Sequence, residues 1–455
     1  MNVPYALLHK YNVPGPRYTS YPPAPSFSAD VGPQEYEQIL EESNRSGAPL
    51  SLYFHLPFCE KLCYFCGCTV VITGKNHSPA ERYFELLKKE IAWTAERIDR
   101  SRPVVQMHWG GGTPTYSAPA ALEALAAEIR REFTFDPDAE IGVEVDPRVT
   151  TRAHLEALAR AGFNRLSMGV QDFDPDVQKA VNRVQPYDDT RRLVEDARAL
   201  GFESVNIDLI FGLPHQTAAG FRETVARVLE IAPDRLAVYS YANVPWMKKH
   251  QAVLEPHLPG EREKFEIFSM ALELFSDGGY EYIGMDHFAR PDDELARARR
   301  NRTLWRNFQG YTTKAGTDLL GLGMSAIGSV ADAFVQNEKA LAPYENAIAL
   351  GGPATTRGYR LTDDDRLRGH VIQSLLCHGV IDKEAVEKRF GIDFDEAFAD
   401  ALERLETCES DGLVELEPRE IRATTLGRIF LRNLAMPFDA HLPKDAQKPM
   451  FSRTL

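Results

Sequence analysis

The stretch Pro57–Thr69 reads PFCEKLCYFCGCT and directly follows a short apolar run, SLYFHL. It holds four of the six cysteines in a chain of 455 residues: Cys59, Cys63 and Cys66 in the spacing C-x3-C-x2-C, and Cys68 after one glycine. Clustered thiols in a chain without an export signal favour metal chemistry over disulfides. A structural zinc site uses two ligand pairs separated by a finger or ribbon, and no second Cys/His pair stands at such a distance in the sequence.

Three thiolates in one loop suit a [4Fe–4S] cluster with an open position, because an electron-transfer cubane takes four protein thiolates. An iron without a protein ligand can bind a substrate or a cofactor. The spacing therefore predicts a cluster that takes part in chemistry. A purely structural iron–sulfur or zinc protein is the alternative.

The loop resembles the cluster-binding signature of the radical S-adenosylmethionine (SAM) superfamily. With its flanks, YFHLPFCEKLCYFCGC, it is similar to the oxygen-independent coproporphyrinogen III oxidase family, also called coproporphyrinogen dehydrogenases. The spacing alone would indicate only the superfamily. The resemblance extends over nearly the whole chain, through GPRYTSYP at Gly15–Pro22, HWGGGTPT at His108–Thr115, EVDP at Glu144–Pro147, GVQDF at Gly169–Phe173, NIDLIFGLP at Asn206–Pro214, IGMDHFARPDDEL at Ile283–Leu295 and NFQGYTT at Asn307–Thr313.

The resemblance implies a radical SAM oxidoreductase of porphyrin and haem biosynthesis. In such enzymes the residues matching Cys59, Cys63 and Cys66 hold a [4Fe–4S] cluster, SAM binds the fourth iron, and reductive cleavage of SAM gives a 5′-deoxyadenosyl radical. The radical takes a hydrogen atom from a propionate of coproporphyrinogen III, and loss of CO2 and one electron leaves a vinyl group. Two such events give protoporphyrinogen IX. An electron donor and an acceptor are required, and neither can be identified from the sequence.

The resemblance also implies two SAM molecules beside one another, and individual matches place their contacts on this chain. Whether the second SAM is a second oxidant or a placeholder stays open. Cys68 matches a cysteine that matters for activity without ligating the cluster, and a spare packed thiol is the alternative. The positions matched around the cluster-bound SAM are Tyr53, Gly111, Glu144 and Ile327, and those around the second SAM are Phe65, Gly112, Thr113, Gln171, Arg183, Asp208 and Ala242.

The residue types suit these roles. Glycines such as Gly111 and Gly112 let backbone groups touch a carboxylate or an amino group. Arg183 can bind a carboxylate through two parallel hydrogen bonds. Any one of these polar groups could instead be structural, and His55 and His108 could be catalytic or merely packed. The arginines that could bind a substrate propionate are Arg17 first, then Arg290, Arg302 and Arg306.

Apolar runs alternate with amphipathic stretches from Leu50 onward. Such alternation predicts βαβ units and a parallel sheet. Six units make the incomplete (β/α)6 barrel that the resemblance implies, and a doubly wound open sheet is the alternative. The motifs follow the runs, at the strand ends where barrels carry function. The runs are SLYFHL, VVQMHW, EIGVEV, NRLSMGV, SVNIDLIFG and DRLAVYSYA, and the expected helices are Glu81–Ile98, Ala118–Phe133, Arg152–Ala161, Thr190–Leu200, Gly220–Ile231 and Glu261–Ser276.

Three parts are expected: an N-terminal arm over residues 1–35, a barrel with an extension over 36–352, and a small C-terminal domain over 353–455. The arm is rich in proline and aromatic residues, which predicts extended chain rather than helix. From Tyr280 to Gly352 the pattern favours Gly-rich loops and short helices, with YEYIGMDHF as one further strand. GTDLLGLGMSAIGS is expected to allow close backbone approach.

The C-terminal part is expected to be mostly helical and winged-helix-like. A capping box of Thr362 and Asp365 opens its first helix. Two more helices are expected at Lys383–Phe390 and Phe394–Glu409, and GLVELEPREIRATTLG predicts a β-hairpin. The remaining cysteines, Cys377 and Cys408, are expected in its core.

The composition limits the partners. A net charge of −14 and the absence of basic runs argue against nucleic acid or an anionic membrane. No run of eighteen uncharged apolar residues occurs, so we expect a cytoplasmic protein, and no surplus amphipathic segment demands more than a monomer. Competing functions on the same scaffold are a haem chaperone, which usually lacks Cys68 and the long arm, and a methyltransferase or haem-opening enzyme.

Overall fold

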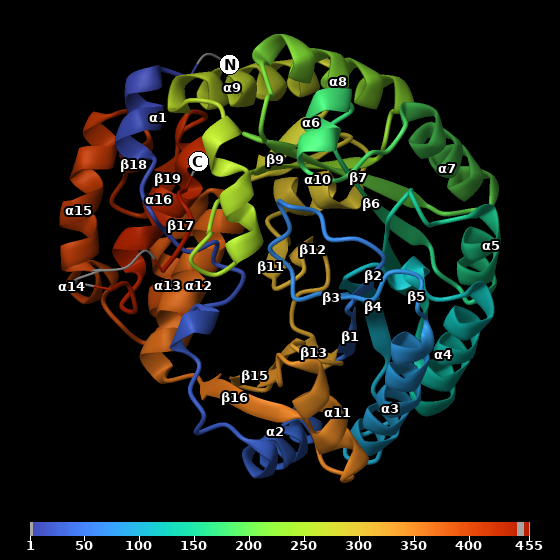
Figure 1. Ribbon diagram of the computed structural model, residues 1–455. Coiled ribbons are helices and arrows are strands. Elements are labelled where there is room, and N and C mark those ends of the chain that lie inside the picture. The colour runs from blue at the N-terminus through green and yellow to red at the C-terminus, as the bar shows by residue number, and fades with distance from the viewer. Residues whose placement is uncertain (1–2, 444–449, 455) are drawn as a thin grey trace.

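The fold is a ring of helices around a curved sheet, as the computed structural model in Figure 1 shows for residues 3–443 and 450–454. The largest sheet within these residues has 12 strands in the order β16-β15-β14-β13-β1-β4-β5-β6-β7-β8-β10-β9. Its two end strands, β16 (Thr355–Arg360) and β9 (Glu281–Gly284), are not hydrogen-bonded to each other. The predicted incomplete barrel is confirmed, and the doubly wound alternative is wrong.

Six parallel strands form the barrel proper. Each of the six predicted helices is present, with boundaries within three residues of the prediction, and a short α6 (Pro175–Ala180) is added after β6. The strands are β1 (Leu50–Leu56), β4 (Val104–Gly111), β5 (Phe135–Val145), β6 (Arg165–Gln171), β7 (Ser204–Phe211) and β8 (Arg235–Ser240), and the helices are α3 (Ser78–Ala95), α4 (Pro119–Glu132), α5 (Arg152–Arg160), α7 (Tyr187–Ala199), α8 (Ala218–Ile231) and α9 (Glu261–Asp277).

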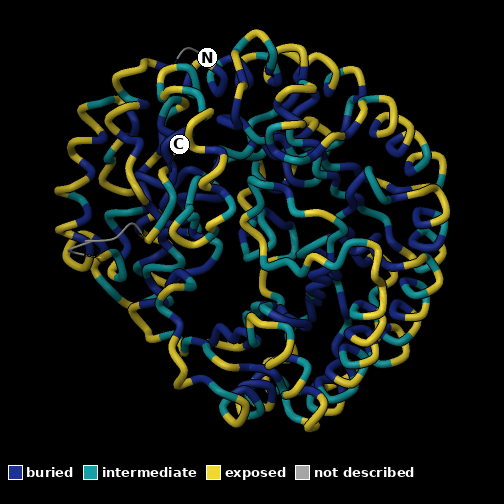
Figure 2. The backbone as a smooth tube through the Cα atoms, viewed as in Figure 1, coloured by how far each residue is buried: buried dark blue, intermediate teal, exposed yellow. Residues whose placement is uncertain are grey.

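Alternation along the strands sorts apolar from polar side chains. In β6, Leu166, Met168 and Val170 are buried against the helices, and the residues between them are only partly buried. In β7 the same alternation leaves Asn206 and Asp208 partly buried. Because successive side chains of a strand point to opposite faces, the polar set lines the inside of the barrel. Figure 2 shows the buried strands and the exposed outer turns of the helices.

Residues 280–352 depart from the prediction of loops and short helices. YEYIGMDHF, expected as one strand, instead forms a hairpin of β9 and β10 (His287–Ala289), of which β10 pairs antiparallel with β8 and extends the sheet. The remainder is mostly short strands, and β13 (Asp318–Leu322) pairs in parallel with β1. Close backbone approach explains the glycines, since a Cβ on Gly321 would lie 2.6 Å from the backbone of Ile327. The other elements are α10 (Glu294–Arg300), β11 (Trp305–Asn307), β12 (Gly310–Thr312), β14 (Ile327–Val330), β15 (Ala333–Asn337) and α11 (Leu341–Ala349).

The C-terminal part combines helices with a three-stranded antiparallel sheet. The capping box of Thr362 and Asp365 is confirmed at the start of α12 (Asp363–His378). The expected helix over Phe394–Glu409 is interrupted at Phe398, which is buried with backbone angles outside the helical range. The remaining elements are α13 (Lys383–Phe390), α14 (Phe394–Ala397), α15 (Ala399–Ser410), α16 (Leu431–Ala435), β17 (Val380–Asp382), β18 (Val414–Leu416) and β19 (Glu420–Ala423), and Cys377 and Cys408 are buried as expected.

The N-terminal arm is only partly extended. Residues Tyr5–Tyr11 form the helix α1, so the prediction of a wholly extended arm is wrong there. The prolines lie outside this segment, and burial of Leu8 and Tyr11 stabilises it. The prediction is also wrong at Ala24–Ser26, a short 3-10 helix, and from Pro33, where α2 (Pro33–Ser46) begins. The segments between these helices are extended, and Pro14 bridges to Arg453. No helix among the described residues is long and apolar enough to span a membrane.

Arg432 is the side chain that fixes the arm. It is buried and donates to the backbone carbonyls of Pro16 (3.0 Å) and Gly15 from the arm and of Arg453 (3.2 Å) and Thr454 (3.1 Å) from the chain end. One guanidinium therefore holds both termini of the chain together.

We predict that Arg432→Met lowers the free energy of unfolding by about 3 kcal/mol, because it leaves several buried carbonyls without a donor. Urea unfolding measures the loss, and limited proteolysis should then cut within the arm. Arg404→Met, at an exposed position of α15, is the matched control. An arm equally protected in both variants would contradict the prediction.

Candidate functional site

The cysteine loop connects β1 to α3 and is closed at its base. Strand β2 (Phe58–Cys59) pairs with β3 (Val71–Ile72), and the Val71 amide donates to the Pro57 carbonyl at 2.8 Å. Phe58 is fully buried, with its ring centroid 5.4 Å from that of Tyr83. The base of the loop is thus packed on the core. Cys59 ends β2 at this base, and the other three cysteines lie in the segment between β2 and β3.

The four thiols have different surroundings. Cys63 is buried, Cys59 and Cys66 are partly buried, and Cys68 is exposed at the rim. Burial raises the pKa of the Cys59 thiol to about 12. A hydrogen bond between the last two thiols lowers the pKa of Cys66 and raises that of Cys68. Cys68 therefore contacts Cys66, a predicted cluster ligand, but is more exposed to solvent than Cys66.

The donor set suits an iron–sulfur cluster. Cys59, Cys63 and Cys66 offer soft thiolate ligands on one loop, which is the ligand type that such clusters use. In residues 3–443 and 450–454, no three His, Cys, Asp or Glu side chains are gathered closely enough to hold a single metal ion. These cysteines would each bind a different iron of a cluster.

A glycine turn after β4 presses against the start of the loop. Gly112 donates to the Leu56 carbonyl at 2.9 Å, and a Cβ on Gly112 would lie 2.4 Å from the carbonyl carbon of Pro57. Gly111 has φ +109°, and a Cβ there would lie 2.5 Å from the His55 ring. Only glycine fits either position. The turn and the loop therefore form one rigid cradle with backbone groups at its surface.

Tyr53, predicted beside the first cofactor position, is tied to the cysteine loop through His55. Tyr53 donates to Nδ1 of His55 (3.0 Å), and His55 donates from Nε2 to the Thr69 carbonyl of the cysteine loop (2.9 Å). His55 is thus a packed, fully partnered histidine, and burial lowers its pKa. The ring of Tyr53 stacks on that of His108 with centroids 6.3 Å apart.

Glu144 is held ionised inside the barrel. His108 lies 3.4 Å from one carboxylate oxygen, and the Gly111 amide donates to the other at 3.1 Å. Burial opposes ionisation, but these partners lower the pKa of Glu144 below its usual value. The carboxylate is therefore positioned beside the glycine turn, as predicted for a contact of the first SAM.

The residues predicted around the second cofactor position include unpartnered buried atoms. Oε1 of Gln171 and Nε of Arg183 are buried without a hydrogen-bond partner. Gln171 also has φ +69°, a conformation that a non-glycine residue adopts only when its surroundings impose it. Both atoms are satisfied if a polar ligand binds there.

Asp208 lies in the same barrel cavity as Glu144, a space of about 160 Å³ also lined by His108, Tyr239 and His287. Asn206 donates to its carboxyl at 2.7 Å, whereas Arg183 and His108 act on it only through longer-range attraction. Burial raises the pKa of Asp208 to about 7. Two carboxyls in one cavity thus differ in their readiness to ionise.

The other predicted contacts do not line this cavity. Thr113 lies 3.4 Å from the Cys59 sulfur, and Phe65 accepts a hydrogen bond from Gln251 through its carbonyl at 2.8 Å. Ala242 follows the end of β8, and Ile327 begins β14, towards the two ends of the sheet.

Arg17 reaches the barrel from the arm. It forms an ion pair with Asp286 at 2.7 Å and lies over the Tyr239 ring at 5.6 Å. Of the other arginine candidates, Arg306 is buried, with Nε and Nη1 unpartnered, whereas Arg290 and Arg302 are exposed. Of the four arginine candidates, Arg306 is therefore the one with buried N–H groups that lack hydrogen-bond partners in the described structure.

Sequence reasoning missed two groups of residues. Asp146 and Arg148, just after Glu144, contact the surroundings of Cys63; their place at the end of β5 could have indicated them. Lys248, His250 and Gln251 bind carbonyls of the cysteine loop, with His250 2.9 Å from the Cys66 carbonyl. Contacts to backbone carry no residue signature, so the sequence gives no sign of this second group.

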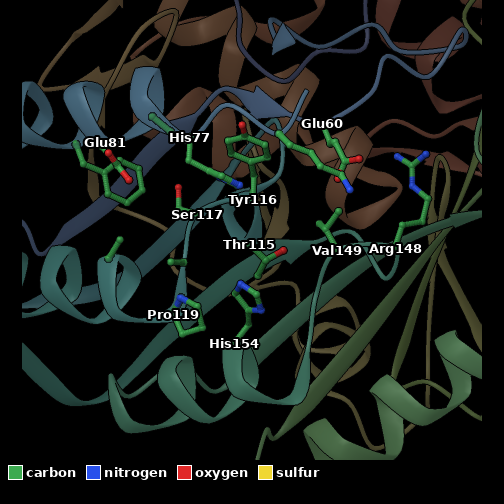
Figure 3. A pocket seen from close by; sticks show the side chains of 15 residues that line it. Glu60, His77, Glu81, Thr115, Tyr116, Ser117, Pro119, Arg148, Val149 and His154 are labelled. Carbon is green, nitrogen blue, oxygen red and sulfur yellow. The ribbon is translucent and has the colours of Figure 1, made fainter. Parts of the chain in front are cut away.

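A further cavity lies outside the barrel interior. It measures about 530 Å³ and opens between α3, α4 and α5, with His77, Tyr116 and His154 on its walls (Figure 3). None of the predicted site residues lines it, although Arg148 stands at one end beside Glu60.

Comparisons with known proteins match this geometry. A family model described as the radical SAM superfamily matches residues 53–228, and one described as the HemN C-terminal domain matches 361–430. The oxygen-independent coproporphyrinogen III oxidase of Escherichia coli is 46% identical over 99% of this chain and 98% of its own. The enzyme of the same name from Synechocystis is 42% identical over 99% of this chain and 97% of its own length. A solved structure, "Coproporphyrinogen III oxidase (HemN) from Escherichia coli is a Radical SAM enzyme", has a TM-score of 0.92 at 44% identity, covering 97% of this chain and all of that one.

We predict that Gly112→Ala displaces the cysteine loop, because the new Cβ meets the Pro57 backbone. Metal-free protein should lose about 2 kcal/mol of unfolding free energy, and anaerobic reconstitution should insert clearly less iron per chain. Gly32→Ala, with nothing within 4 Å of the new Cβ, is the control. Full iron content in Gly112→Ala would refute the steric argument.

Asp208 predicts a pH-dependent stability. Its pKa is about 7 in the folded chain against 3.8 ordinarily, so the folded state keeps its proton while the unfolded chain loses it. Stability should therefore fall as the pH rises from about 4 to 7, by at most about 4 kcal/mol. Asp208→Asn stays neutral and should exceed the wild type in stability at pH 8, with a smaller gain at pH 5.5.

Urea unfolding of the metal-free proteins across this pH range measures that difference. Asp188→Asn, at an exposed position of α7, is the matched control and should show no comparable pH-dependent gain. A gain for Asp208→Asn that does not vary with pH would contradict the assignment.

Proposed function

The chain belongs to the oxygen-independent coproporphyrinogen III oxidase family of radical SAM enzymes, and on this premise we propose how its site performs the reaction. The reaction is the anaerobic oxidative decarboxylation of two propionates of coproporphyrinogen III to vinyl groups, giving protoporphyrinogen IX. The observation that carries the proposal is the three-cysteine loop packed on its glycine turn. It occurs in a chain that is 46% identical to the Escherichia coli enzyme over 99% of its length.

The cofactors are a [4Fe–4S] cluster and SAM. Bound together, they supply a 5′-deoxyadenosyl radical that can take a hydrogen atom from a propionate. Cys59, Cys63 and Cys66 hold the cluster in our proposal, and the methionine part of SAM lies against the backbone of Gly111 and Gly112, where no side chain stands in the way. The rigid cradle that these glycines form with the loop supports this assignment.

The remaining contacts of the first SAM are assigned to Glu144, Tyr53 and Ile327. The ionised Glu144 suits an amino group or ribose hydroxyls, because it accepts hydrogen bonds on both oxygens. Tyr53 is tied to the loop through His55, so it is fixed in place before any cofactor binds. Ile327 would offer an apolar contact from β14.

A second SAM is part of the proposal. It would be held by Phe65, Gly112, Thr113, Gln171, Arg183, Asp208 and Ala242. The unpartnered Oε1 of Gln171 and Nε of Arg183 support it, since a polar ligand would satisfy both buried atoms. Asp208, with a pKa of about 7, can donate a hydrogen bond to a ribose hydroxyl when protonated and accept one when ionised.

Cys68 is proposed as the catalytic thiol outside the cluster. Its side chain is exposed while that of its neighbour Cys66 is not, and its carbonyl is held by Lys248 at 2.7 Å. A solvent-exposed thiol on a fixed backbone suits a residue that must contact the substrate.

The substrate propionates are assigned to Arg17 and Arg306. Arg17 is aligned by Asp286, and Arg306 has two buried donors without partners, which a carboxylate would satisfy. A pocket of about 300 Å³ between the arm and the C-terminal part adds aromatic walls from Tyr18, Tyr21 and Phe308. Its mixture of arginine and aromatic side chains suits a tetrapyrrole with carboxylate arms. A monomer in the cytoplasm, with separate electron donor and acceptor proteins, completes the proposal.

The test is turnover by protein reconstituted anaerobically with iron and sulfide, given SAM, dithionite and coproporphyrinogen III. We expect CO2 and protoporphyrinogen IX. Cys66→Ala should lose iron and SAM cleavage together, whereas Cys68→Ser should keep the iron content and lose protoporphyrinogen formation. Cys408→Ala, in the C-terminal part, is the matched cysteine control.

Two outcomes would overturn the proposed reaction, and a third would remove one residue from it. Haem transfer without turnover would indicate a chaperone, and a methylated tetrapyrrole would indicate a methyltransferase. Full activity in Cys68→Ser would remove that residue from the reaction while leaving the rest intact.

A further inference from the structure

We propose that Arg148 and Arg183, held by the carboxylate of Asp146, hydrogen-bond to the Cys63 sulfur and set the reduction potential of the cluster. The inference rests on the proposed function only in taking Cys63 as a cluster ligand. It adds a positioning and tuning role for two residues, Asp146 and Arg148, that belong to none of the cofactor contacts assigned above.

The geometry converges on one sulfur atom. Nη2 of Arg148 lies 3.4 Å from Sγ of Cys63, and Nη1 of Arg183 lies 3.6 Å from it. These are normal distances for N–H groups donating to sulfur. Cys63 is only 7% exposed, so solvent does not compete strongly for these donors. Cys59 and Cys66, in contrast, contact no arginine within hydrogen-bond distance in the described structure.

Asp146 binds both guanidinium groups. Its Oδ2 accepts from Arg148 at 2.6 Å and from Arg183 at 3.1 Å. All three side chains are largely buried, with side-chain exposures of 9% for Asp146, 18% for Arg148 and 9% for Arg183. One carboxylate therefore aligns two cations, and the group keeps a net positive charge beside the sulfur.

Backbone hydrogen bonds also fix this group. The Arg148 amide donates to the Asp146 side chain at 3.0 Å, and the turn is closed by Thr150, whose amide donates to the Asp146 carbonyl at 3.0 Å. Nη2 of Arg183 is tied to the Gly169 carbonyl at 2.6 Å. The donors are thus in place before a cluster is inserted, so no reorganisation is needed when Cys63 binds iron.

The positive charge of the two arginines should raise the reduction potential of the cluster. Reduction adds an electron to the cluster, and positive charge and hydrogen bonds at a ligand sulfur stabilise the reduced form. In a site screened from water these interactions are stronger than at a surface. Removing one donor and its charge should therefore make the cluster harder to reduce, with a more negative midpoint potential.

Two simpler roles compete with this one. Arg148 could serve only as a structural partner of Asp146, and Arg183 could serve only the second SAM. Neither role predicts a change of potential in a variant that folds and binds its cluster normally. Arg148 is the better probe because it has no assigned cofactor contact and also borders the outer cavity shown in Figure 3.

The experiment compares full-length Arg148→Met, Arg148→Lys and wild-type protein after anaerobic reconstitution, at equal iron content and without SAM. A redox titration followed by electron paramagnetic resonance gives the midpoint potential. We expect a shift to more negative potential in Arg148→Met and a smaller one in Arg148→Lys, which keeps the charge but loses the planar pair of donors. Arg160→Met, at an exposed residue of α5 that pairs with Glu123, should leave the potential unchanged.

An unchanged potential in Arg148→Met would overturn the inference. So would the loss of the cluster from both Arg148 variants, since that indicates a purely structural role. The measurement needs no tetrapyrrole, so a failure of the proposed reaction and a failure of this inference are told apart by the turnover assay on the wild type.

Discussion

The site depends on a steric constraint between two backbones. The glycine turn after β4 touches the first residues of the cysteine loop so closely that a Cβ on Gly112 would lie 2.4 Å from Pro57. Two backbone hydrogen bonds, Gly112 to Leu56 and Thr113 to Phe58, both 2.9 Å, lock the contact. The loop that carries the cysteines and the glycine turn predicted to contact SAM are therefore held together as one unit, so a displacement of either one is passed to the other.

The barrel interior is built for polar ligands at a cost in stability. Parallel strands usually bury apolar side chains on both faces, yet here the inner face carries Glu144, Asp208 and Asn206. His108 keeps Glu144 ionised, whereas Asp208 forms no ion pair with a described residue and burial raises its pKa. Neighbouring carboxyls with different ionisation can serve an amino group and a hydroxyl respectively. Unsatisfied atoms such as Oε1 of Gln171 fit the same pattern of a fold that keeps groups ready for a ligand.

Much of this could be predicted from the sequence because the signals are local and strong. The spacing of Cys59, Cys63 and Cys66, and the alternation of apolar runs with amphipathic helices, led to the barrel and its functional edge. The features that could not be predicted lack such signals in the sequence. The helix α1 is stabilised by burial of Leu8 and Tyr11 in distant partners, and the short glycine-containing strands of residues 280–352 have no clear period. The contacts of Asp146 and Arg148 with Cys63 are likewise visible only once the chain is folded.

The central claim is a cubane with three protein ligands and one open iron. The most direct measurement is the electron paramagnetic resonance spectrum of the reduced, anaerobically reconstituted protein before and after SAM is added, with iron and sulfide determined on the same sample. The account predicts about four irons and four sulfides per chain and a spectrum that changes when SAM binds. A spectrum unaffected by saturating SAM, or a sample that contains zinc in place of iron, would contradict it.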